Sequence, residues 1–464
     1  MLPLLLLSLA FAYAVFQKGG VWPKDWSVFL LALTLISAFF WLRARRAQLA
    51  PPLERSLRWP LLLLPGYAAF QLLPLPLPLL RLLSPARAEL HDALARQLPS
   101  PSFAPLTVVP AATLEHFVRI AGCLLAFFLL RQLAFRLADH PWALVFPLLA
   151  IAALEAALGL AQFYTKGSEG YARGTFVNRN HYAGFLEMSL PFAVMYPIGV
   201  LRRNPSRHHS PARPALLACA FFALAALILL GVIHSLSRMG FISALFALFV
   251  CGTGILACMF PIPRLRLPRF TFTIAVAVLV LAAFIFLPPD QLIARFGDLA
   301  ATDDISGDTR VQIWKESLRL IAAFPLFGCG LGGYHSAFLK YKQVAPTQTV
   351  DFAHNDYLQS LAELGVLGFA IAAALILAVL AKARRAATAH THPQGQALAI
   401  ACLAALAAIL LHSLADFNLY IPANAMLLTW IAATAASLMF SSRPLPGWRP
   451  APRENPTRLP TFDF

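Results

Sequence analysis

A histidine with three polar residues spaced behind it is the clearest chemical feature of the chain. In FAHNDYLQSLAELGVLG, His354 precedes an apolar run, and Asn355, Gln359 and Glu363 recur every four residues, so they share one face of a predicted helix. A neutral imidazole at the membrane boundary can take a proton from a hydroxyl group. Taken alone, a lone histidine favours a helix cap or anchor. The polar stripe favours a catalytic base, because Gln and Glu inside a membrane helix are costly and tend to line cavities.

Two arginines stand where an anion could bind. Arg238 closes Ser-Leu-Ser-Arg, a very short predicted turn between two apolar runs, and it either anchors a helix end by snorkelling or offers a planar fork of donors to phosphate. Arg310 heads a predicted helix beside Thr309 and Asp308, where backbone N–H groups also favour an anion. The alternative for Arg310 is a surface ion pair with Asp308 or another nearby acid.

The segment RGTFVNRNHYAGFLEM, from Arg173 to Met188, opens another predicted helix with polar side chains. Asn180 and Glu187 are seven residues apart, so they stack on one face. Two interpretations stay open: a contact to a glycan or headgroup, or a capped helix with one internally bonded acid.

Three further segments carry weaker signals. The glycine-rich residues 324–336 have no preceding strand and no following Walker lysine, which favours a plain turn over nucleotide binding. The acidic residues 302–308 are typical of a solvated loop, with a divalent cation site as the alternative. In residues 412–424, His412 and Asp416 are one helical turn apart, and this polar group either caps and joins two helices or braces the active site.

Composition limits what these residues can belong to. Of 464 residues, 59% are hydrophobic and 12% are charged, whereas a soluble domain is about half apolar and about a quarter charged. The chain is therefore not a typical soluble enzyme. A net charge of +16 would raise the question of nucleic acid in a soluble protein. Here we expect no nucleic acid partner, because the basic residues gather in alternate connections between apolar runs.

The apolar runs predict an all-α polytopic membrane protein with about twelve transmembrane helices. The positive-inside rule then places both termini in the cytoplasm. The first run is alternatively a cleaved signal peptide, and the proline-rich third run is predicted to be kinked or partly interfacial. The expected helices lie near residues 1–17, 25–42, 59–83, 111–130, 141–163, 181–201, 214–234, 239–260, 271–287, 357–381, 397–415 and 421–440.

One connection is much longer than the others. Residues 288–356 are mostly polar and are predicted to form a loop that faces the periplasm. This loop separates predicted helices 1–9, in residues 1–287, from predicted helices 10–12, in residues 357–440. Within the loop, Arg310–Phe324 is predicted to form an amphipathic helix, with Ile313, Trp314, Leu318 and Ile321 near one face. Residues 441–464 are expected to be a disordered cytoplasmic tail. The six cysteines predict neither a disulfide framework nor a zinc site.

The combination of motifs resembles the O-antigen ligase and polymerase superfamily of bacterial membrane glycosyltransferases. The resemblance rests on NRNHYAGFLEMSLP, HSLSRMG, DTRVQIWKESLRLIAAFPLFGCGLGGY, AHNDYLQSLAELGVLG and, more weakly, HSLADFNLYIPAN, in this order over about residues 170–425. Each motif is weak, and their order together with the long loop makes the joint signal specific. The first five predicted helices match only in hydropathy.

The resemblance implies a role for each matching residue. Arg238 and Arg310 correspond to the arginines taken to grip the diphosphate of an undecaprenyl-linked glycan donor, and His354 to the histidine proposed to activate the acceptor hydroxyl. It also implies inversion at the anomeric carbon and no metal or other cofactor, since fixed guanidinium groups stabilise the leaving oxygens. The expected location is the bacterial inner membrane, with the active site facing the periplasm.

Three functions remain open at this point. A ligase would move the glycan to lipid A-core or a protein hydroxyl, and a polymerase would join lipid-linked repeats of O-antigen or exopolysaccharide, using a saccharide acceptor. Both need an anion grip and a base, so the resemblance does not separate them. A transporter would line a path with polar residues, but no inverted repeat or paired broken helices are visible in the sequence.

Overall fold

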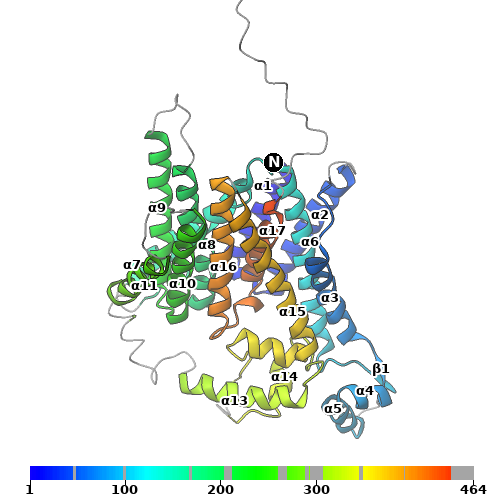
Figure 1. The fold of residues 1–464 in the computed structure, drawn as a ribbon. Helices are drawn as coiled ribbons and strands as arrows, with labels where there is room; N and C mark the ends of the chain where they lie inside the picture. The colour runs from blue at the N-terminus through cyan, green and yellow to red at the C-terminus, as the bar shows by residue number, and fades with distance from the viewer. Residues whose placement is uncertain are drawn as a thin grey trace, which may run out of the picture.

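The computed structural model describes residues 1–44, 49–97, 101–166, 170–202, 212–259, 269–287, 292, 307–343, 349–390 and 392–439. Figure 1 shows an upright bundle of helices, with α4, α5, α13 and α14 gathered beyond one end of it. We call this the loop end. The first half of the chain contains α1 (Leu2–Phe16), η1 (Lys18–Gly20), α2 (Pro23–Arg43), α3 (Arg55–Leu72), β1 (Leu75–Pro76), α4 (Leu77–Leu83), α5 (Pro85–Ala95), β2 (Phe103–Ala104), α6 (Pro110–Arg136), η3 (Pro141–Leu144), α7 (Phe146–Lys166) and α8 (Arg179–Leu201).

In the second half, the regular elements among the described residues are all helices. It contains α9 (Ala212–His234), α10 (Arg238–Gly254), η5 (Ile255–Met259), α11 (Arg269–Phe286), α13 (Gly307–Ala323), α14 (Tyr334–Phe338), α15 (Asp356–Ala389), α16 (Pro393–His412), η6 (Asn418–Tyr420) and α17 (Pro422–Ser437).

In the described part of the chain, eight helical segments are long and apolar enough to cross a membrane, and the helices Leu2–Phe16 and Thr273–Ile285 are apolar but shorter. The expected all-α polytopic class is therefore confirmed, whereas eight segments, and not twelve, reach this length and composition. The eight segments are Pro23–Arg43, Pro110–Arg136, Phe146–Thr165, Arg179–Leu201, Ala212–His234, Arg238–Met259, Asp356–Ala389 and Pro393–His412.

The third predicted helix, residues 59–83, is not continuous. Helix α3 ends at Leu72, the short strand β1 pairs antiparallel with β2, and α4 follows. Prolines at every second position from Pro74 to Pro78 explain the break, because proline lacks an N–H donor and disfavours the helical conformation of the residue before it.

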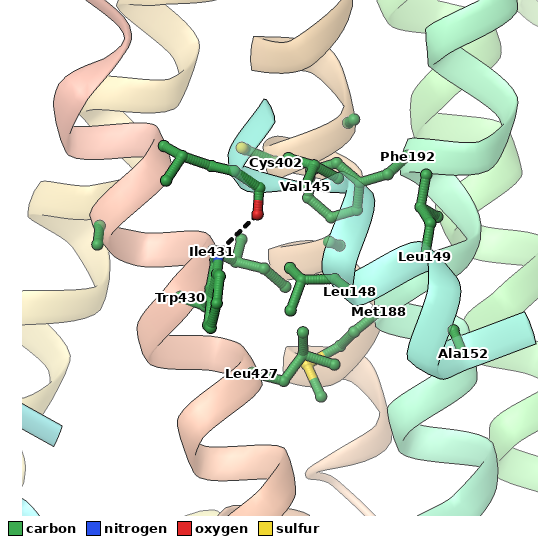
Figure 2. Packing of buried hydrophobic residues seen from close by; sticks show 14 of the residues in the cluster. Val145, Leu148, Leu149, Ala152, Met188, Phe192, Cys402, Leu427, Trp430 and Ile431 are labelled. Atoms are coloured by element: carbon green, nitrogen blue, oxygen red, sulfur yellow. Dashed lines mark hydrogen bonds between the residues drawn. The ribbon is translucent and has the colours of Figure 1, made fainter. Parts of the chain in front are cut away.

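The core lies where α8, α16 and α17 pack together. In each of the central helices α8 and α16, 72% of the apolar 18-residue stretch that could cross the membrane is buried inside the protein. Alanines line α16, and a Cβ atom added at Gly199 of α8 would lie 3.0 Å from the Cβ of Ala397, so the two backbones approach closely. Figure 2 shows buried Trp430 of α17 packed among these helices, with its indole N–H donating to the Leu144 carbonyl oxygen at 2.9 Å.

The amphipathic helix expected at Arg310–Phe324 is present as α13, but its buried face differs from the prediction. Leu318 is 55% exposed, whereas Glu316 and Ser317 are fully buried. The reason is hydrogen bonding within the loop: Glu316 accepts from the Gln343 N–H, and the Ser317 hydroxyl bonds to Tyr334. Two polar residues therefore share the inner face with Ile313, which is fully buried as predicted, whereas Leu318 lies outside it.

Helix α15 begins at the loop end and changes conformation at Gly365. This glycine has φ of 63° and ψ of −176°, and a Cβ atom there would lie 2.4 Å from the Leu326 carbonyl group. Only glycine fits both conditions. The long loop can therefore pack directly against the α15 backbone and carry α13 to the start of α15.

Candidate active site

His354 lies immediately before α15 in a strained backbone conformation. Its φ is +49°, a value that non-glycine residues rarely adopt. The next residue, Asn355, fixes this turn: its side-chain oxygen accepts from the Tyr357 and Leu358 N–H groups, and its amide donates to the Leu414 carbonyl at 2.9 Å. The turn is thus tied both to α15 and to the segment that follows α16. The His354 side chain is 16% exposed.

The His354 ring faces the carboxylate of Asp416, which follows α16. Nδ1 of His354 lies 3.8 Å from Asp416 Oδ1, and Nε2 of His181, in α8, lies 3.8 Å from the same oxygen. The ring of Phe417 meets both imidazoles edge-on, with ring centroids 5.0 Å from His354 and 4.7 Å from His181. Three distant parts of the chain therefore converge on one carboxylate.

Asp416 is held in its charged form. Burial raises the pKa of this carboxyl, but the facing imidazoles of His181 and His354, together with the charge of His412, outweigh burial and hold the pKa well below its ordinary value. Its Oδ1 also accepts from the Phe417 N–H at 2.9 Å. A fixed carboxylate beside an imidazole orients the ring and stabilises the imidazolium that forms when the ring takes a proton.

Arg310 reaches the same place from the long loop. Its Nη1 donates to the carbonyl oxygen of Ala415, the residue before Asp416, at 3.2 Å. Its Nε is buried and has no hydrogen-bond partner among the described residues. The guanidinium therefore stands beside the His354–Asp416 pair with donor capacity left for an anion.

Arg238 opens α10 at the same end of the bundle. Ser237 caps the helix by accepting from the Gly240 N–H, and Leu236 before it has φ of +55°. A Cβ atom at Gly240 would lie 2.4 Å from that of Ala183, so the first turn of α10 packs on the first turns of α8, close in sequence to His181. Arg238 itself is half-buried.

The segment before α8 carries Arg173 on its surface. Arg173 is exposed, and the following Gly174 packs against buried Glu155 of α7, which accepts from both the N–H and the hydroxyl of Thr175. Asn180 is half-buried in the first turn of α8, and its N–H donates to the cap residue Asn178. Glu155 was not singled out in the sequence, although it holds this segment.

The polar stripe of α15 bonds inside the protein. Gln359 accepts from the Ala353 N–H and donates to Glu363. Glu363, in turn, accepts from the N–H groups of Gly332 and Tyr334. The glycine-rich segment is therefore a turn whose amides bind this side chain.

Tyr420 adds a fourth bond to Glu363. Burial and the Glu363 carboxylate raise the pKa of Tyr420 well above its ordinary value, so its hydroxyl stays protonated and donates to Glu363 Oε2 at 2.7 Å.

Glu187 is fully buried and also bonds inside the protein. Both of its oxygens lie near Nδ1 of His412, at 3.0 and 2.9 Å. Of the two interpretations of this acid, the structure shows the internally bonded one. Asn424, also in the polar group after α16, donates to the His181 carbonyl oxygen at 3.0 Å and so joins α17 to α8.

Sequence reasoning missed His181. The residue stands in NRNHYAGFLEM, and its position one turn into a helix that opens with polar side chains was the available signal. Among the described residues, no group of three or more His, Cys, Asp or Glu side chains could hold a metal ion. The acidic segment considered for a cation, with Asp303 and Asp304, lies outside the described residues.

Residues 223–373 match the family model of the O-antigen ligase. The matched region runs from α9 into α15 and includes Arg238, Arg310 and His354. A search of curated proteins found no match. The match supports the resemblance to the O-antigen ligase and polymerase superfamily. Together with the apolar helices, it indicates a multi-pass membrane protein.

Proposed function

We propose that this member of the O-antigen ligase and polymerase superfamily is a glycosyltransferase that moves a glycan from undecaprenyl diphosphate to a hydroxyl acceptor. The convergence of His354, Asp416 and Arg310 carries the proposal. A general base, a carboxylate that orients it and a guanidinium with free donor capacity are the groups that this transfer needs.

In the proposed reaction, His354 takes the proton of the acceptor hydroxyl. The acceptor oxygen attacks the anomeric carbon of the glycan as the bond from that carbon to the phosphate oxygen breaks. The electron pair stays on the leaving undecaprenyl diphosphate. Direct attack from the opposite side inverts the anomeric configuration.

Arg310 and Arg238 are proposed to bind the diphosphate and to stabilise the negative charge that develops on it. Arg310 is well placed for this, since it is anchored through Nη1 and keeps its Nε unbonded within the described residues. Two guanidinium groups supply this stabilisation without a metal ion, so we propose a metal-independent reaction.

Arg173 and Asn180 are proposed to contact the glycan or its diphosphate, because they lie in or before the first turn of α8, close to His181. For Asn355, Gln359 and Glu363 we propose a positioning role in place of substrate contact. Their side chains bond to the backbone that shapes the His354 turn and the glycine-rich segment.

The active site is proposed to face the periplasm, and the membrane to be the bacterial inner membrane. Support comes from charge at the other end of the bundle. Lys382 and Arg385, late in α15, both pair with Glu54 ahead of α3, whereas His354 stands at the beginning of α15. Basic residues near helix ends favour the cytoplasmic side.

The acceptor separates the ligase from the polymerase, which remains the second candidate because the superfamily includes both. We expect a ligase that uses lipid A-core or another hydroxyl. Purified protein would be incubated with an undecaprenyl-diphosphate oligosaccharide and an envelope extract, followed by mass analysis of the product. A glycan on a new acceptor supports the ligase, a ladder of joined repeats supports the polymerase, and transport of intact donor without any release of undecaprenyl diphosphate contradicts both.

A further inference from the structure

A second acid–histidine pair lies directly behind the proposed base. Glu187 of α8 and His412, the last residue of α16, are both fully buried, and their side chains are 2.9 Å apart. A buried carboxylate on a membrane helix is costly unless it is paired. The pair joins α8 to α16, which explains part of why Glu187 is buried there. The orientation of the His412 ring gives the pair a second role, because it connects Glu187 to Asp416.

The His412 ring bridges two carboxylates. Its Nδ1 meets Glu187, so its Nε2 points the other way and lies 4.0 Å from Asp416 Oδ2. The other oxygen of Asp416 faces His354. Glu187, His412, Asp416 and His354 therefore form one row that leads from the buried bundle to the loop end.

The facing atoms of this row, and the neighbouring ring of His181, have no hydrogen-bond partner within the described residues. They are Nε2 of His412, Oδ2 of Asp416, Nε2 of His181 and Nδ1 of His354. A buried polar atom without a hydrogen bond is costly. Each of these atoms therefore depends on its neighbours in the row, and moving one member changes the surroundings of the next.

The charges in the row add to the geometry. His412 lies between the carboxyl groups of Glu187 and Asp416 and so couples the two acids. His181 faces the same carboxylate as His354, and Asp356 nearby accepts from the Ser413 hydroxyl and the Leu419 N–H. The Asp416 carboxylate stabilises the positive charge that His354 acquires when it takes the acceptor proton.

We propose that Glu187 is a positioning residue for the base: it acts through His412 on Asp416, and through Asp416 on the orientation of His354. This inference rests on the proposed function. It assigns Glu187 no contact with substrate.

The test compares kcat and donor KM, as a function of pH, for the wild type, Glu187→Gln, Glu187→Asp and His412→Gln in proteoliposomes. We expect Glu187→Gln to lower kcat about 10- to 100-fold with little change in KM, since a misplacement of about 1 Å in a catalytic group costs roughly 10²-fold. The pH profile of kcat should change as well, because the row that positions the base loses one of its two acids. Glu187→Asp should restore part of the rate.

Two matched control variants measure the effect of replacing a buried polar side chain that lies outside the row. Ser189, on the same helix, bonds to the Phe185 carbonyl, and His390 bonds to the Leu438 carbonyl, so neither belongs to the row. Ser189→Ala and His390→Gln should leave the pH profile in place. Melting temperatures and donor binding would be measured for every variant, so that a loss of folding is recognised.

The double variant Glu187→Gln with Asp416→Asn tests whether the effect of Glu187 on kcat passes through Asp416 or only through the stability of the contact between α8 and α16. If Glu187 acts through Asp416, the double variant should be no slower than Asp416→Asn alone. Additive losses, or an unchanged kcat profile in Glu187→Gln, would overturn the inference while leaving the proposed function intact. No release of undecaprenyl diphosphate by the wild type would instead contradict the proposed function, and normal turnover in His354→Ala would remove His354 as the base.

Discussion

Replacing Asp416 by asparagine removes the charge that faces His354 while it keeps the size of the side chain. Two unit charges 3.8 Å apart interact by about 4 kcal/mol at an effective dielectric constant of about 20. His181 and His412 share the carboxylate, and the His354 side chain is 16% exposed, so only part of this energy is expected to reach His354. A loss of about 1.4 kcal/mol in transition-state stabilisation lowers the rate about tenfold.

We therefore expect Asp416→Asn to slow proton transfer to His354. The sign follows from the charges: without the carboxylate, the positive charge that the ring acquires with the acceptor proton is less well stabilised. At the optimum, kcat should fall by about 10² or more, because the imidazole loses its orienting partner and the charge that stabilises it after proton uptake.

The assay measures release of undecaprenyl diphosphate from a lipid-linked oligosaccharide between pH 4.5 and 9, at saturating donor. Asp416 itself does not titrate in this range in the wild type, since its pKa lies well below its ordinary value. A kcat within twofold of the wild type across this pH range would refute the electrostatic reasoning.

The other predictions concern the arginines proposed to bind phosphate, the proposed independence from metal ions, and the packing of the long loop on α15. Replacing Arg310 or Arg238 by lysine should raise the donor KM about 10-fold, because a point charge lacks the bidentate fork; unchanged kinetics in both variants would place the diphosphate elsewhere. Turnover should persist in EDTA, and loss that Mg²⁺ or Mn²⁺ restores would contradict the metal-independent reaction. Gly365→Ala should lower the free energy of unfolding by at least about 1–3 kcal/mol, because its φ is +63° and a Cβ atom would strike Leu326. The matched control Gly66→Ala meets no atom within 4 Å, and equal melting temperatures in detergent would contradict this account of α15.

Hydropathy predicted most of the helices because a membrane span is a local property of about 20 residues. It failed where local chemistry competes with hydropathy. The alternating prolines after Leu72 replace the end of one apolar run with a strand, and hydrogen bonds draw Glu316 and Ser317 to the inner face of α13. The amphipathic pattern located this helix and placed Ile313 correctly on its buried side, but it also assigned the exposed Leu318 to that side.

The sequence allowed individual site residues to be predicted, but not the contacts between residues that are distant in the chain. His354 and the stripe behind it follow from spacing within one segment. The pairing of Glu187 with His412 joins residues 225 positions apart, and periodicity carries no information about such contacts. The same limit applies to Glu363: its position on a helix face was evident, whereas its bonds to the glycine-rich segment depend on the loop folding back.

The most direct test of the central claim compares wild type and His354→Ala for release of undecaprenyl diphosphate, with donor binding measured on the same preparations and His390→Gln as the control histidine variant. We predict that His354→Ala loses at least about 10²-fold in turnover while donor binding stays within a few-fold of the wild type. Near-normal turnover in His354→Ala would show that His354 is not the base and would contradict the mechanism.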